Sequence, residues 1–184
     1  MKLKRYQFKI VGASPLLMNS SMNMVNNTGK VGKKVIPTAE EECKSKEYKD
    51  KKGRYYIPTS CFRNAILYAC SGKRVNKRSA KAVLQSAIFP GEEDFVLCNP
   101  SSNKPLGSYQ IDTRPAVIQK ARIMRRRPRF EDWGGTLTLD IDTDITTPEV
   151  IEEQLAEAGV ISGVGDFRIQ KGGTFGRFTA SLVK

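Results

Sequence analysis

The chain has 184 residues, 39% hydrophobic and 27% charged, so it is long enough to bury one core and is expected to form a single domain. Its 31 Lys and Arg residues against 19 Asp and Glu residues give a net charge of +12, which favours phosphate-rich partners. Histidine is absent, the four cysteines lack C-x-x-C spacing, and no segment approaches the roughly 18 apolar residues of a membrane span, so we expect a cytoplasmic protein with reduced thiols and no metal or cofactor.

The N-terminal segment predicts a strand over residues 3–11. Tyr6, Phe8 and Ile10 alternate there with polar residues, which is the period of a half-buried strand. Residues 20–54 follow as a long insertion that is rich in Lys, Glu, Gly and Asn and has little to bury. Such a loop is usually disordered or functional, and the sequence leaves both open.

The segment YYIPTSCFRNAILYAC predicts the first helix, with Thr59 or Ser60 as its N-cap. Arg63 projects away from the apolar side of this helix near its N-terminus. Backbone N–H groups and the helix dipole favour a phosphate at such a position, so Arg63, with Asn64 beside it, is a candidate binding residue. A second helix is predicted over residues 79–89, and a variable insertion over residues 90–110.

Positive charge is most concentrated in the stretch from Arg114 to Trp133, which we expect to form a strand that runs into a turn. Seven basic residues lie here with no acidic residue between them: Arg114, Lys120, Arg122, Arg125, Arg126, Arg127 and Arg129. Arginine is always charged and presents two donors to one phosphate. Phe130 and Trp133 follow and offer rings on which unpaired bases could stack. The stretch indicates a nucleic-acid surface, and the alternative is a solvated basic face with both rings in the core.

The C-terminal third predicts a strand, a helix and a last strand. In the segment TLTLDIDTD, Leu137, Leu139 and Ile141 are expected to face the core, and the polar residues Thr138, Asp140, Asp142 and Asp144 to face solvent. Proline follows Thr147, which predicts a helix start, and this helix is expected to end at Gly159. With GTFGRFTASLV as the last strand, the order of elements is βαββαβ. The predicted fold is therefore α+β, with a ferredoxin-like (RRM-like) core and a long insertion after its first strand.

A glycine-rich loop, residues 163–177, is expected between the second core helix and the last strand. It lacks the ending of a Walker loop, so it does not predict nucleotide hydrolysis. Its glycines could let the backbone approach a phosphate chain, with Arg168, Lys171 and Arg177 as counter-charges. The alternative is a turn that merely needs positive φ angles.

The charges are unevenly divided along the chain. Residues 130–167 contain ten acidic residues and no basic one, so the remainder carries 31 basic against 9 acidic residues. A basic face and an acidic face on one molecule allow copies to associate head to tail. We therefore expect a homo-oligomer or filament.

Three stretches together resemble a known family: ASPLLMNS, YYIPTSCFRNAI, and ARIMRRRPRFEDW with GVGDFRIQKGGTFGRF. They are similar to an uncharacterised phage-encoded family and, more distantly, to the RAMP superfamily, the crRNA-binding backbone subunits of CRISPR effector complexes. The resemblance covers most of the chain outside 20–54 and 90–110. It implies a helix opening with I-P-x-S near the RNA backbone, here Ile57, Pro58 and Ser60 with Arg63, and a glycine-rich loop that helps to hold the RNA.

The favoured function is binding of single-stranded nucleic acid, RNA in preference to DNA, by copies aligned along the strand. The resemblance adds other effector-complex subunits as candidate partners. Three alternatives stay open: a phage single-stranded-DNA-binding or annealing protein, a RAMP-type endoribonuclease, and a phage decoy that binds a host protein complex. Some RAMP subunits cut RNA with an aspartate in the loop after the first strand, where this chain has only Asp50. Without histidine or a convincing carboxylate pair, an enzyme is the weaker hypothesis.

Overall fold

The computed structural model of the protein describes residues 1–21, 37–75, 77–118 and 121–183. Its strands are β1 (Leu3–Gly12), β2 (Leu16–Leu17), β3 (Tyr56–Pro58), β4 (Arg74–Val75), β5 (Arg78–Ser79), β6 (Ile88–Pro90), β7 (Asp94–Val96), β8 (Gln110–Ile118), β9 (Ala121–Phe130), β10 (Gly134–Asp142) and β11 (Phe178–Leu182). Its helices are α1 (Ala39–Lys44), α2 (Thr59–Ala69), α3 (Ala80–Ala87), α4 (Pro148–Ile161) and the 3-10 turn η1 (Ile169–Lys171). The predicted α+β class is confirmed.

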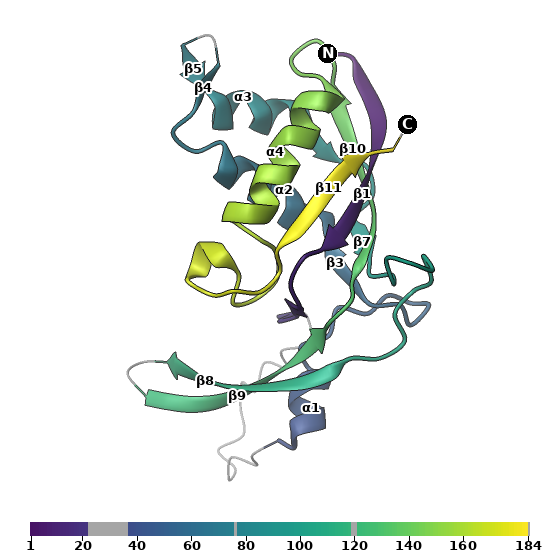
Figure 1. The fold of residues 1–184 in the computed structure, drawn as a ribbon, viewed down its shortest axis with the longest axis vertical. Coiled ribbons are helices and arrows are strands. Elements are labelled where there is room, and N and C mark those ends of the chain that lie inside the picture. Colours follow the sequence, from purple (N-terminus) through teal and green to yellow (C-terminus); the bar gives the residue numbers. More distant parts are fainter. Residues whose placement is uncertain (22–36, 76, 119–120, 184) are drawn as a thin grey trace, which may run out of the picture.

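The main sheet has four antiparallel strands in the order β11-β1-β10-β6, and α2 and α4 pack together on one side of it (Figure 1). Phe8 of β1 lies opposite Leu137 of β10, and both side chains are fully buried. Phe62 of α2 and Leu155 of α4 belong to the same hydrophobic core. The alternation of apolar residues along the sequence thus located the buried side of this sheet.

The predicted helices form, with one difference in how they begin. Thr147 caps α4 by accepting a hydrogen bond from the Val150 N–H, as the sequence predicts. At α2, however, the cap is Pro58, and neither Thr59 nor Ser60 serves as the N-cap. Thr59 is buried, and its N–H donates to the carbonyl of Glu93 instead. A tertiary hydrogen bond therefore takes the place of the expected side-chain cap.

The aspartates of β10 do not form the solvated face that the alternation predicts. Thr138 and Asp142 are only 3% exposed. Asp142 accepts hydrogen bonds from the backbone N–H groups of Lys2 and Asp144. Asp140 receives two hydrogen bonds from the Arg5 guanidinium, which, by hydrogen bonding and charge, holds the pKa of this carboxyl below its ordinary value. These carboxylates are satisfied within the chain.

A second sheet, in the order β2-β9-β8, carries the arginine stretch. The sequence predicts a strand and a turn here, but the stretch belongs to two long strands, β8 and β9, which form an antiparallel hairpin. Figure 1 shows this hairpin running across the end of the molecule away from α3, with α1 beside it. Phe130 at the end of β9 belongs to the main hydrophobic core, so the hairpin is anchored to the rest of the domain.

Both predicted insertions contain regular structure. The described part of the first insertion, residues 20–21 and 37–54, includes α1, which begins with a capping box formed by Thr38 and Glu41. Residues 22–36 lie outside the described residues. In the second insertion, β7 pairs antiparallel with β3. No helix in the described part of the chain combines the length and apolar character that a membrane crossing needs.

Candidate nucleic-acid interface

One face of the β8–β9 hairpin packs against the glycine-rich loop through arginine and phenylalanine side chains. The register places Arg114 opposite Arg125 and Asp112 opposite Arg127, so these four residues share a face. The Arg114 guanidinium lies 4.4 Å from the Phe175 ring centroid, and that of Arg127 lies 4.7 Å from the Phe167 ring centroid. Both distances are those of cation–π contacts, which join the hairpin to the loop.

Arg127 and Arg129 take part in this internal contact rather than standing free in solvent. Arg127 is 7% exposed and pairs with Asp166, a residue of the glycine-rich loop. Arg129 pairs with Glu131 at 2.7 Å and lies 3.6 Å from Asp112. Arg127 Nη1 and Arg129 Nε are buried without a hydrogen-bond partner among the described residues. Arg127 is therefore structural, which corrects its predicted role in a phosphate track, whereas the phosphate contact predicted for Arg129, whose side chain is 29% exposed, stays a prediction.

Carboxylates distant in sequence compensate the local excess of arginine. Asp112 accepts a hydrogen bond from Arg114 Nε at 2.7 Å, and Glu42 of α1 contacts both Arg125 and Arg126. Burial raises the pKa of Glu42, but the Lys46 hydrogen bond, the Arg126 N–H and the nearby cations outweigh it and hold this pKa below its ordinary value. The lack of acidic residues between positions 114 and 129 thus gave an incomplete picture of the charge.

Exposed cations remain toward the free end of the hairpin. The side chains of Arg114, Arg125 and Arg126 are 38%, 37% and 32% exposed. Lys46 Nζ donates to the Arg126 carbonyl and to Glu42. With Arg129, five cations therefore surround two carboxylates here, those of Asp112 and Glu42. For Arg122 only the backbone is described, within β9, and Lys120 lies outside the described residues.

Phe130 and Trp133 do not offer stacking surfaces, contrary to the prediction. Phe130 is 2% exposed and Trp133 is fully buried. The Trp133 indole N–H donates to the Ser14 carbonyl, and its ring lies so close to Gly12 that a Cβ there would be 2.3 Å from Nε1. Both rings belong to the core, which was the alternative interpretation of the sequence.

The glycine-rich loop brings three further cations to the surface beside the hairpin. Arg168 is held in place because its Nε donates to Gln170 and its Nη1 to the Gly165 carbonyl. Lys171 in η1 and Arg177 before β11 are exposed. The backbone at Gly176 lies close to another part of the protein rather than open to a ligand, since a Cβ there would lie 1.8 Å from the Val164 carbonyl oxygen. The loop therefore needs this glycine for its own packing.

Arg63 and Ser60 differ in what surrounds them. The Arg63 guanidinium donates to the carbonyls of Ile88 and Gln85, at the end of α3. It satisfies backbone acceptors at a helix C-terminus, a structural role that the sequence prediction missed. Ser60 is exposed in the first turn of α2, where the predicted backbone contact stays a prediction.

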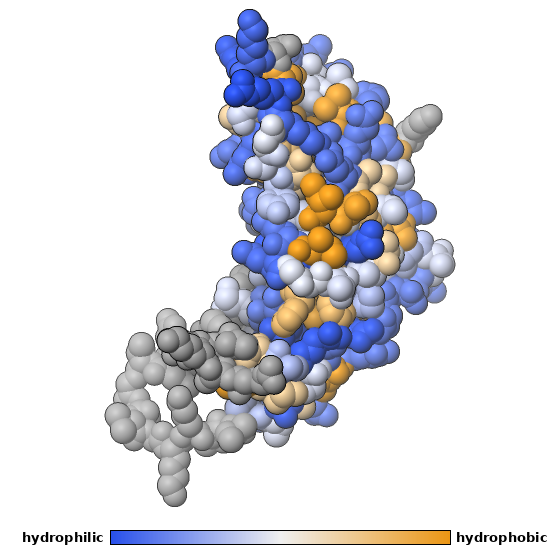
Figure 2. All heavy atoms as spheres, turned by 60° about the vertical axis from the view of Figure 1, so that its left-hand side comes forward, coloured by the Kyte–Doolittle hydropathy of each residue, from blue (hydrophilic) through white to orange (hydrophobic). Residues whose placement is uncertain are grey.

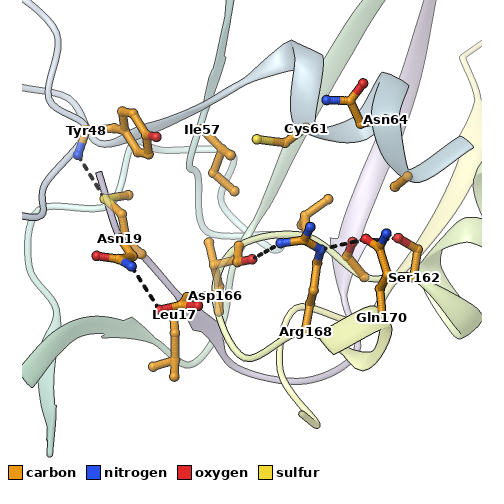
Figure 3. A pocket seen from close by; sticks show the side chains of 16 residues that line it. Leu17, Asn19, Tyr48, Ile57, Cys61, Asn64, Ser162, Asp166, Arg168 and Gln170 are labelled. Carbon is orange, nitrogen blue, oxygen red and sulfur yellow. Dashed lines mark hydrogen bonds between the residues drawn. The ribbon is translucent and has the colours of Figure 1, made fainter. Parts of the chain in front are cut away.

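A cleft of about 290 Å³ lies between α2, the glycine-rich loop and the segment that follows β1. Figure 3 shows Arg168 extending from the loop towards α2, with Ile57 and Cys61 on the far side and Asp166 beside it. Asn19 donates to Asp166 at 3.1 Å, and the same carboxylate pairs with Arg127 of the hairpin. Asp166 therefore links the cleft to the hairpin.

Sequence reasoning missed most of this cleft. Asn19, Tyr48 and Gln170 line it, yet the sequence did not single out any of the three, because their segments have no strand or helix periodicity. The available signal was that ASPLLMNS, the first turns of the helix at residue 59 and the glycine-rich loop were the stretches that carry the family resemblance. Those three stretches meet here.

Comparisons with known proteins add no assignment to this geometry. No protein-family model matches the chain, and no curated protein matches it. Within the described ranges, no three Cys, Asp or Glu side chains group together as ligands for a metal ion.

Figure 2 shows a face on which hydrophilic side chains predominate around a smaller apolar patch.

Proposed function

We propose that this protein binds single-stranded nucleic acid on the surface shared by the β8–β9 hairpin and the glycine-rich loop. One observation carries the proposal: the contacts of Arg114 with Phe175 and of Arg127 with Asp166 join the arginine-rich hairpin to the glycine-rich loop, whose Arg168 lines the cleft. Arg114, Arg125 and Arg126 would contact phosphates from the hairpin, and Lys171 and Arg177 from the loop, while Arg168 would contact the strand from within the cleft.

The core supports a more specific fold assignment. The elements β1, α2, β6, β10, α4 and β11 follow the order βαββαβ, and their strands form one antiparallel sheet. We propose that this is a ferredoxin-like core to which α1 and the second sheet are added. On the sheet face away from the helices, β1 and β10 present Arg5, Gln7, Lys9, Thr136, Thr138 and Asp140. None of these six is aromatic, so the cleft and hairpin are better candidates than RRM-type stacking on the sheet.

RNA is the favoured ligand because the resemblance to the RAMP backbone subunits implies it. A helix opening with Ile57 and Pro58 and a glycine-rich loop line the same cleft, which is the pairing that the resemblance implies. A single-stranded-DNA-binding or annealing protein would use the same cations, so both nucleic acids belong in the test. Binding of a host protein complex instead would leave both of them unbound.

The RAMP-type endoribonuclease remains the weaker alternative. Asp50 is the aspartate that would carry this activity. It accepts hydrogen bonds from the backbone N–H groups of Arg54 and Lys52 and pairs with the Arg54 side chain. The Arg54 backbone hydrogen bond is the main reason that the pKa of Asp50 is lowered. This carboxylate holds a turn and is poorly placed to accept a proton from RNA.

Photo-crosslinking tests the location directly. A 4-thiouridine-labelled single-stranded RNA and its 4-thiothymidine DNA counterpart are irradiated with the protein, and the crosslinked peptides are identified by mass spectrometry. We expect crosslinks in residues 121–130 and 161–177. Crosslinks confined to the β4–β5 end of the molecule, or none with either strand, would contradict the proposal.

A further inference from the structure

The cleft beside the hairpin has the size of a site for one small group. Its volume of about 290 Å³ lies at the lower end of the roughly 300–1,000 Å³ typical of ligand pockets. The surrounding backbone is closely packed, since a Cβ at Gly165 would lie 2.6 Å from the Leu17 carbonyl oxygen. The cleft therefore suits a single planar group, and a stretch of strand would not fit within it.

The chemistry of the lining distinguishes between the parts of a nucleotide. Leu16, Ile57 and Val164 line the cleft and are each at most 3% exposed, so part of its wall is apolar. Asp166 and Arg168 supply a carboxylate and a guanidinium (Figure 3). The Arg168 N–H groups beyond those bonded to Gln170 and Gly165 have no partner in the described part of the chain.

We propose that this cleft holds one unpaired nucleobase of the bound strand, an inference that rests on the proposed function. The apolar wall opposes a phosphate, and the Asp166 carboxylate, already paired with Arg127, offers it no donor. A base instead has apolar faces and an edge that carries both donors and acceptors, which match the wall and the two charged side chains. Asp166 binds Arg127 of the hairpin, so the base would enter beside the cations that hold the backbone.

The test compares an oligonucleotide with its abasic counterpart, which keeps every phosphate. Cys61 lines the cleft, so Cys61→Phe fills it, while Gln85→Phe on the exposed side of α3 adds the same ring outside the cleft as the control. By fluorescence anisotropy with a 12-nucleotide RNA, we expect wild type and Gln85→Phe to lose about tenfold in affinity when the bases are removed. Cys61→Phe should bind the normal and abasic strands within about twofold of each other.

A second variant keeps the test decisive if Cys61→Phe does not fold. Asn64 is exposed at the rim of the cleft, and Asn64→Phe should have the same effect, whereas Gln85→Phe on the exposed side of α3 should not. If base removal costs the same affinity in the filled variants as in wild type, the cleft holds no base. If wild type binds neither strand, the proposed function itself is wrong.

Discussion

Arg127 and Arg125 lie two residues apart on one strand face but differ in burial, and this difference predicts different effects of their loss. Arg127→Ala would leave the Asp166 carboxylate without its partner next to the core. We expect a loss of unfolding free energy of about 2–3 kcal/mol, less than the roughly 3–5 kcal/mol for a fully buried pair, because Asp166 is 28% exposed. Urea denaturation followed by circular dichroism measures it.

Arg125→Ala is the matched control for that substitution. Its side chain is 37% exposed and lies 3.7 Å from Glu42, so its loss should change the unfolding free energy by no more than about 0.5 kcal/mol. Equal losses in both variants would show that Arg127 is not the buried anchor of the hairpin.

For individual residues, the sequence showed where the charged side chains lie in the chain but not which residues they contact. The run from Arg125 to Arg127 is visible in the sequence, yet its carboxylate partners, Glu42 and Asp166, lie about 80 and 40 positions away. The Phe130 ring packs against Tyr55 and Tyr109, and Trp133 packs against Gly12 and donates to the Ser14 carbonyl, contacts that no local pattern reveals. Pairing across such distances is a property of the fold.

Among the elements, the glycine-rich loop offers a clear comparison between two glycines. Gly176 and Gly172 both have positive φ, at 69° and 76°. A Cβ at Gly176 would lie 1.8 Å from the Val164 carbonyl oxygen, whereas a Cβ at Gly172 would meet nothing within 4 Å. Gly172→Ala should therefore cost only the backbone strain, about 1–2 kcal/mol. Gly176→Ala should cost clearly more, because the loop must also move away from Val164.

Thermal denaturation of the two variants, with nucleic-acid affinity measured on the folded fraction, checks this prediction. Gly176→Ala should lower the melting temperature further than Gly172→Ala and should also weaken binding, because Arg168 and Arg177 lie in the displaced loop. Identical melting temperatures would mean that the loop relaxes around Gly176 without cost.

Three strands of the main sheet were predictable because their apolar residues alternate. Phe8 and Ile10 in β1, and Leu137 and Leu139 in β10, are examples. Strand β6 was not, since the sequence predicts residues 88 and 89 as the end of a helix and the arginine stretch as a core strand. The β8–β9 hairpin carries arginine on its packed face, so no apolar alternation marks it. Helix α1 is only six residues long and buries Cys43 and Glu42, too little for a periodic signal.

At the scale of the whole molecule, the acidic stretch supports a proposal of head-to-tail assembly, through carboxylates of α4 rather than those of β10. Asp140 and Asp142 are already satisfied by Arg5 and the Lys2 N–H, so they are poor contacts for a neighbouring copy. Glu149 and Glu153 are exposed one turn apart on α4. We propose that these two carboxylates meet the basic surface of the next protomer along a strand.

Light scattering after size exclusion tests this assembly. The mass of the wild-type complex should grow with strand length, because each added length of strand tethers further copies. Glu149→Lys with Glu153→Lys should keep the affinity for a 12-nucleotide strand but lose that growth. Growth equal to that of wild type would mean that the acidic face of α4 is simply solvated.

The charge of +12 makes salt dependence the most direct test of the central claim, which is that the exposed cations of the hairpin hold the phosphates. The variant Arg125→Ala with Arg126→Ala removes two of them. The control Arg74→Ala with Arg78→Ala removes two exposed arginines from the β4–β5 hairpin at the opposite end of the molecule (Figure 1).

The affinity for a single-stranded RNA is measured by anisotropy across a range of salt concentrations, and the logarithm of the binding constant is plotted against the logarithm of salt. If both arginines contact phosphates, the slope of the hairpin variant should fall by about 1.4, at roughly 0.7 per contact, while the slope of the control stays at the wild-type value. A hairpin variant with an unchanged slope, or a control whose slope falls equally, would contradict the account.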